Sequence, residues 1–110
     1  MKIELIIRTQ FESFHCWPDA PDDVSFLRFT HRHIFHVETS IAGHHLDRSL
    51  EFFQIKRNID NFFKETVFPL SSSCEYMAAE LLKYLEQLNY TVNYISIFED
   101  NENGARISHE

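Results

Sequence analysis

The amino-acid sequence predicts an α+β fold in which a four-stranded antiparallel sheet carries two helices on one face, in the order ββααββ. Apolar and polar residues alternate in two long N-terminal stretches, which is the period of a half-buried strand. Two stretches in the middle of the chain repeat apolar residues every three or four positions, which indicates amphipathic helices. The 110 residues, 44% of them hydrophobic, can build one modest core, so we expect a single domain over residues 1–110.

The first two strands are predicted over Lys2–His15 and from about Phe29 to Ala42, with the loop WPDAPDD at residues 17–23 between them. Two prolines and three aspartates exclude a helix or a central strand from that loop. In the second strand His31 and His33 share one face with Phe35, because side chains repeat every two residues. The two imidazoles therefore point the same way.

The helices are predicted from about Leu50 to Phe63 and from the serine run at residues 71–73 onward. Pro69 closes the segment that follows the first helix. Ser72 and Glu75 have the spacing of a capping box, which predicts the start of the second helix. The apolar stripes consist of Phe52, Ile55, Ile59, Phe62 and Phe63 in the first helix and of Ala78, Leu81, Leu82, Leu85 and Leu88 in the second.

The last two strands are predicted at the C-terminal end of the chain. Alternation with β-branched and aromatic residues runs from Tyr90 to Phe98, and DNENG supplies a turn that contains Gly104. The sequence ARISHE at residues 105–110 can then pair back as a short final strand.

Composition excludes several classes of partner. A net charge of −7, with no run of basic residues, makes nucleic acid an unfavourable ligand. No apolar stretch approaches the roughly 20 residues that span a bilayer, and the alternating N-terminus does not fit a signal peptide. We therefore expect a cytoplasmic protein that does not enter the membrane, with Cys16 and Cys74 as free thiols.

Three of the seven histidines have a pattern that fits a metal site. His31 and His33 lie on one strand face, and His15 ends the neighbouring antiparallel strand. Three imidazoles so placed can bind one zinc ion and leave a fourth position open for water or substrate. An HxH pair alone is a weak signal, and the alternative is that these histidines lie on the surface by chance.

Several motifs together carry a family resemblance. FESFH at residues 11–15 is similar to F-x-A-A-H, and HRH at 31–33 is similar to H-G-H. SLEFFQIK at 49–56, SSCE at 72–75 and SIFED at 96–100 match three further motifs in the same order. The chain thus resembles the 6-pyruvoyl- and 6-carboxy-tetrahydropterin synthases, small zinc enzymes of the tunnelling fold. The similarity extends over nearly the whole chain.

The resemblance implies a ligand set, a substrate class and an assembly. His15, His31 and His33 would bind Zn²⁺, and Glu99 would anchor a pterin through two parallel hydrogen bonds. The residues expected to line the same pocket are Ser73, Cys74 and Glu75. The implied activity is that of a lyase in biopterin or queuosine biosynthesis. The implied assembly is a homo-oligomer, a trimer or hexamer, in which the sheets close a barrel and the sites lie between subunits.

The chain also departs from the family pattern. Leu27 stands where the family has a cysteine that serves as general base. Val67 and Phe68 stand where it has an Asp-His pair that assists proton transfer. The residues that could replace the missing base are Cys16, Asp22 and Asp23.

Three hypotheses follow for the function. The first is a zinc-dependent enzyme that acts on 7,8-dihydroneopterin triphosphate or a related dihydropterin, by elimination, isomerisation or side-chain cleavage, with a non-standard base. The second is a catalytically degenerate relative that binds a pterin or purine without turnover. The third is a small structural protein whose histidines bind no metal.

Overall fold

Four strands form one antiparallel sheet in the order β1-β2-β3-β4, which confirms the predicted α+β class and the ββααββ order of the main elements. A computed structural model describes all residues from 1 to 110. The elements along the chain are β1 (Glu4–His15), the 3-10 helix η1 (Asp22–Arg28), β2 (His31–Ala42), α1 (Phe52–Glu65), α2 (Cys74–Gln87), β3 (Val92–Glu99) and β4 (Asn103–Ser108).

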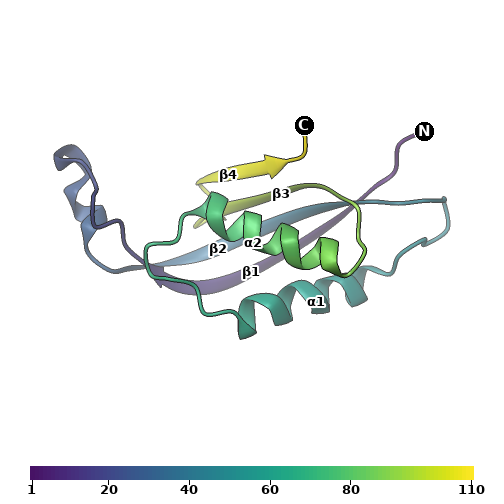
Figure 1. Cartoon of the computed structure of the whole chain (residues 1–110), viewed down its shortest axis with the longest axis horizontal. Coiled ribbons are helices and arrows are strands. Elements are labelled where there is room, and N and C mark those ends of the chain that lie inside the picture. Colours follow the sequence, from purple (N-terminus) through teal and green to yellow (C-terminus); the bar gives the residue numbers. More distant parts are fainter.

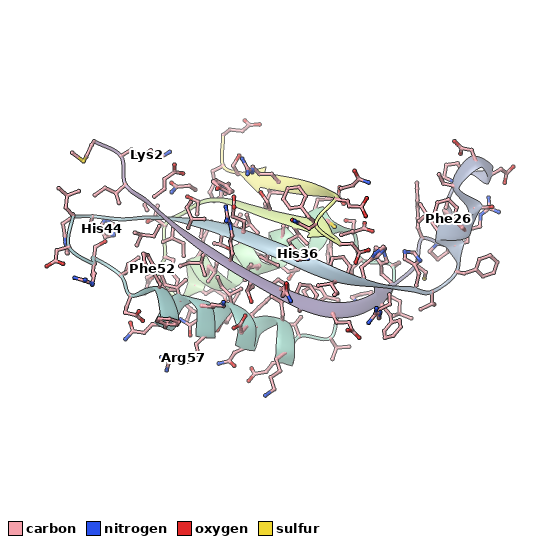
Figure 2. The ribbon with its side chains drawn as sticks, turned by 180° about the vertical axis from the view of Figure 1, so that it is seen from behind. Lys2, Phe26, His36, His44, Phe52 and Arg57 are labelled. Atoms are coloured by element: carbon pink, nitrogen blue, oxygen red, sulfur yellow. The ribbon has the colours of Figure 1, made fainter.

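The two long helices lie on one face of the sheet, where α1 packs on β1 and α2 packs on β3 and β4 (Figure 1). The opposite face is uncovered, and Figure 2 shows His36 of β2 on this face. The molecule is elongated along its strands, with extents of 51, 27 and 22 Å. None of its helices combines the length and the apolar character needed to span a membrane.

The core lies between the sheet and the helices and follows the predicted alternation. Phe35, Val37 and Ile41 of β2 are buried, as their shared face with His31 and His33 requires. The helices contribute Ile55 and Ile59 from α1 and Met77, Ala78, Leu81 and Leu85 from α2. Fully burying one such large side chain stabilises a fold by about 1.5–3 kcal/mol. The core therefore fixes which face of β1 and β2 turns toward the helices.

Most predicted strand boundaries are displaced by two residues. β1 begins at Glu4 instead of Lys2, and β2 begins at His31 instead of Phe29. The pairing of His15 with His31 closes the β1–β2 ladder, so Phe29 has no partner strand. β3 runs two residues later than predicted at its start, and β4 begins two residues before Ala105.

The helix starts also differ from the prediction. Glu51 is the N-cap of α1, and its carboxylate accepts from the backbone N–H of Gln54, so the helix begins at Phe52. The predicted capping box of Ser72 with Glu75 is wrong, because Ser73 caps α2 by accepting from the backbone N–H of Tyr76. A capping side chain satisfies backbone N–H groups that have no partner within the helix.

The segment between β1 and β2 is more structured than the predicted loop. After a turn at residues 18–19 it forms η1, in which Val24 departs from helical geometry. The guanidinium of Arg28 stabilises this segment by donating hydrogen bonds to the carbonyl of Ala20 and to the carboxylate of Asp22. Figure 1 shows η1 projecting from one end of the sheet.

Gly104 lies in β4 opposite Phe98, and not in the turn where the sequence placed it. A Cβ atom at this position would clash with the carbonyl oxygen of Ile97, which belongs to the backbone and cannot shift without distorting β3. We expect Gly104→Ala to lower the free energy of unfolding by about 1–3 kcal/mol, the usual cost of an overpacked site.

Urea unfolding of both glycine variants checks this expectation. Gly43→Ala is the matched control, because its Cβ atom would meet only the side chain of Ile3, at 2.8 Å, and the Oγ of Ser49 at 3.4 Å. These side chains can shift, so the loss should be smaller. Equal losses for the two variants would contradict the expected backbone clash.

The uncovered face of the sheet carries a polar network around Glu38. Glu38 of β2 accepts from Arg8 at 2.8 Å and from the hydroxyl of Tyr94 at 2.7 Å. Arg106 of β4 lies over the ring of Tyr94, 4.0 Å from its centroid. The hydrogen bond from Tyr94 is the main cause that lowers the pKa of Glu38. The polar groups of these side chains thus have partners within the sheet.

Candidate metal centre

Three histidines meet at the end of the sheet where β1 ends and β2 begins. His15 is paired directly with His31, and His33 is paired with Ser13 on the same face. The three imidazole rings lie edge to face, with centroids 4.5 to 4.8 Å apart. The predicted convergence of His15, His31 and His33 is therefore present, and it follows from strand register and side-chain alternation.

Glu99 joins the histidines from β3, where it is paired with Phe35 of β2. Its Oε2 lies 2.8 Å from Nε2 of His33 and 3.5 Å from Nε2 of His15. One ligand atom from each of the four residues lies within 4.8 Å of the others, so the cluster of His15, His31, His33 and Glu99 could hold a metal ion.

The hydrogen bonds of the rings leave nitrogen lone pairs inside the cluster. Nδ1 of His31 donates to the carbonyl of Phe29 at 2.7 Å, and Nδ1 of His33 donates to Oδ2 of Asp100 at 2.6 Å. Nε2 of each ring is buried and makes no hydrogen bond. For His33 this holds although Oε2 of Glu99 is near, because the contact has the distance of a hydrogen bond but not its geometry.

This donor set fits a divalent cation. Buried polar atoms without partners are costly, and a bound ion would satisfy both nitrogens at once. A metal-binding histidine usually binds the ion through one ring nitrogen and donates the N–H of the other to a carbonyl or carboxylate. Imidazole together with one carboxylate oxygen is a ligand set that zinc accepts.

Electrostatics favours the neutral form of His15. Burial is the main cause that lowers the pKa of His15, and the other two histidines act in the same direction. The charge of Glu99 and a backbone hydrogen bond with Ser72 oppose this shift only in part. Because a metal binds neutral imidazole, the lowered pKa reduces the competition from protons as the pH falls.

A cavity of about 540 Å³ adjoins the cluster, within the size range of small-molecule sites. Its lining includes all four residues expected to bind substrate: Ser73, Cys74, Glu75 and Glu99. Cys16, Trp17 and Leu27 also line it, and Ser72 contributes a buried hydroxyl that has no partner. The cavity thus places the start of α2 beside the histidines.

The other base candidates lie apart from this cavity. Neither Asp22 nor Asp23 lines it, and Asp22 is paired with Arg28 at 2.7 Å. A larger, open groove of about 840 Å³ runs along β1 and α1 past His36, but the metal-ligand cluster lies outside it. Of the proposed replacements for the base, only Cys16 lines the cavity.

Cys74 is held as a neutral thiol. Burial is the main cause that raises its pKa to about 12, and the charge of Glu99 adds to the shift. Its Sγ donates to Oε1 of Glu99 at 3.9 Å. Because only the thiolate reacts, we expect Cys74 to be alkylated about a thousandfold more slowly at pH 8 than an ordinary thiol of pKa about 8.5.

Iodoacetamide labelling followed by mass spectrometry checks this expectation. The same thiol in urea serves as the control and should react at the ordinary rate. Folded and unfolded chains that label Cys74 equally fast would contradict the raised pKa.

Three features of the centre were not predicted from the sequence. Asp100 was not singled out, although an acidic residue beside Glu99 at a strand end was a visible signal. The position of Glu99 against Nε2 of His33 depends on the β2–β3 register, which no local pattern reveals. The carbonyl of Phe29 leaves no trace in the sequence, because every residue type has one.

Comparison with known proteins identifies the fold. The chain is similar to an uncharacterized protein from Wolinella succinogenes, with a TM-score of 0.66 and 14% sequence identity over 100% of this chain and 99% of the other. Identity at this level shows a common fold and nothing about activity. No protein-family model and no curated protein sequence matches the chain. The fold is thus supported by a full-length structural match, and the function must be argued from the site.

Proposed function

We propose that the chain is a zinc-dependent protein of the tetrahydropterin synthase type, which binds a dihydropterin in the 540 Å³ cavity and acts on its side chain. The observation that carries this proposal is the pair of buried, unpartnered Nε2 atoms of His31 and His33, which face His15 and Glu99 at the wall of that cavity. The motifs that resemble the synthases supply the substrate class.

His15, His31 and His33 would hold the zinc ion. A zinc ion bound there would polarise the oxygens of the ligand side chain as a Lewis acid. Burial favours the neutral form of His15 by lowering its pKa. The carbonyl of Phe29 orients the ring of His31, and the carboxylate of Asp100 orients the ring of His33. They thereby present nitrogen lone pairs to the ion.

The cavity provides groups for a planar heterocycle with several N–H donors. The Oε1 atom of Glu99 faces the thiol of Cys74, which lines the cavity, while Oε2 faces the histidines. To accept two parallel hydrogen bonds from the amine and ring N–H of a pterin, the carboxylate would turn both oxygens toward the cavity. The unpartnered hydroxyl of Ser72 would bind a further polar atom of the ring.

The second candidate function is binding without turnover, and the proton acceptors of the cavity favour it. Leu27 has no proton to exchange, and the thiol of Cys74 stays protonated at neutral pH. The hydrogen bond with Ser73 lowers the pKa of Glu75, which makes that carboxylate a weak base. A general base contributes about 10²- to 10⁴-fold to a rate, so turnover would depend on Cys16 or on a neighbouring subunit.

A homo-oligomer, trimeric or hexameric, remains part of the proposal. β1 and β4 are the edge strands of the sheet, and unpaired edges favour pairing with another chain. On the uncovered face, Glu38 already accepts hydrogen bonds from Arg8 and Tyr94. Association through the edges would bring further residues to the candidate sites.

The test is a binding titration and a product assay with 7,8-dihydroneopterin triphosphate and the zinc-loaded chain. Binding with product formation supports the first function, and binding without product selects the second. Absence of binding refutes both. His36→Ala is the matched control, because His36 lies on the uncovered face and should leave binding unchanged.

A further inference from the structure

The carboxylate of Asp100 is held by a backbone N–H and an imidazole of β2. Its Oδ1 accepts from the backbone N–H of Ile34 at 2.9 Å, and its Oδ2 accepts from Nδ1 of His33 at 2.6 Å. Its own backbone N–H donates to the carbonyl of Ile34 at 2.7 Å. Asp100 is thus bound to the backbone of β2 at Ile34, the residue after His33, and to the ring of His33 itself.

The backbone of Asp100 has a conformation that favours few residue types. Its φ is 51°, and the φ of the next residue, Asn101, is 58°, both in the left-handed region. Aspartate and asparagine tolerate this region better than other residues with a Cβ atom. The turn between β3 and β4 therefore holds the carboxylate in one place.

Two carboxylates compete for the single proton of a neutral His33 ring, and geometry decides between them. The contact of Nδ1 with Asp100 is a hydrogen bond, whereas the contact of Nε2 with Glu99 is not. The proton therefore belongs on Nδ1. The lone pair of Nε2 is then directed at the cluster of His15, His31 and Glu99.

We propose that Asp100 is a positioning residue that fixes His33 as the Nδ1–H tautomer and so makes its Nε2 available to a divalent metal. This inference rests on the proposed metal centre. It adds the residue that determines how strongly His33 binds the metal ion. Partners that orient a metal-binding histidine in this way are typically worth 10- to 100-fold in metal affinity.

Asp100→Asn is the decisive variant, because asparagine keeps the left-handed backbone and the shape of the side chain. If its Oδ1 keeps the bond from Ile34, its amide N–H faces Nδ1 of His33. That ring nitrogen must then accept, and the proton moves to Nε2, where it blocks the metal. We expect zinc affinity to fall 10- to 100-fold in a competition titration with a chromophoric chelator.

The matched control is Asp47→Asn, an exposed aspartate whose side chain pairs only with Arg48. It should keep the zinc affinity of the parent chain. The second measurement is the ¹⁵N spectrum of the imidazoles in the metal-free chain at pH 9. A purely structural role of Asp100 would not change the tautomer, so this spectrum separates the two roles.

In the parent chain we expect His33 to carry its proton on Nδ1, and in the Asp100→Asn variant on Nε2. The proposal is overturned if the parent His33 is the Nε2–H tautomer, a result that needs no variant to fold. It is also overturned if the variant keeps its zinc affinity, or if it loses affinity while the tautomer stays unchanged. A parent chain that takes up no zinc would instead refute the proposed metal centre itself.

Discussion

Replacing His31 by alanine is expected to lower zinc affinity by about a hundredfold. Structural zinc sites with four protein ligands have apparent binding free energies of about 10–16 kcal/mol, which is about 3 kcal/mol for each ligand. Each 1.4 kcal/mol changes a dissociation constant about tenfold. The ring of His31 bonds only to the backbone carbonyl of Phe29, so its removal leaves no side chain without a partner.

Zinc content after gel filtration and a chelator competition titration measure this loss. His36→Ala should retain full zinc affinity, because His36 belongs to the same strand but faces away from the cluster. Substoichiometric zinc in the parent chain, unchanged by the loss of His31, would favour the third hypothesis, in which the histidines bind no functional metal.

Glu99→Gln is expected to weaken dihydropterin binding by about a hundredfold while one zinc ion per chain remains bound. A hydrogen bond to a charged group contributes about 1.5–3 kcal/mol, and the glutamine replaces an acceptor oxygen with a donor. The three imidazoles of His15, His31 and His33 remain in the variant and should hold the ion.

A titration with 7,8-dihydroneopterin triphosphate and a parallel zinc determination separate two roles of this carboxylate. Loss of ligand with zinc retained identifies a ligand anchor. Loss of zinc would show instead that Glu99 is a fourth metal ligand, which its 2.8 Å contact with Nε2 of His33 would explain. Unchanged ligand binding would refute the anchoring role.

The fold could be predicted largely because the apolar residues of each strand and helix repeat with the period of that element. Alternation placed Phe35, Val37 and Ile41 on the core face together with His31 and His33, and the structure confirms this. Boundaries were less accessible, because they depend on pairing and capping. Phe29 has the composition of a strand residue, yet β2 begins only where His31 meets His15.

The candidate site was predictable where its residues share a strand and less so where they meet through tertiary structure. His31 and His33 follow from a spacing of two, and His15 follows from the antiparallel pairing of β1 with β2. The contact of Asp100 with His33 joins residues that are 67 positions apart in the chain. It depends on the β2–β3 register and on a left-handed turn, neither of which leaves a local pattern.

The pairing of His15 with His31 has a consequence for the projecting segment from residue 16 to residue 30. An ion held by both side chains would crosslink the two ends of this segment. The crosslink would reduce the conformational entropy that the chain loses when the segment closes as a loop. Its binding free energy would then add to the resistance of the β1–β2 hairpin against fraying. Chelation would loosen the end of the molecule that carries η1 before it disturbed the helix-covered core.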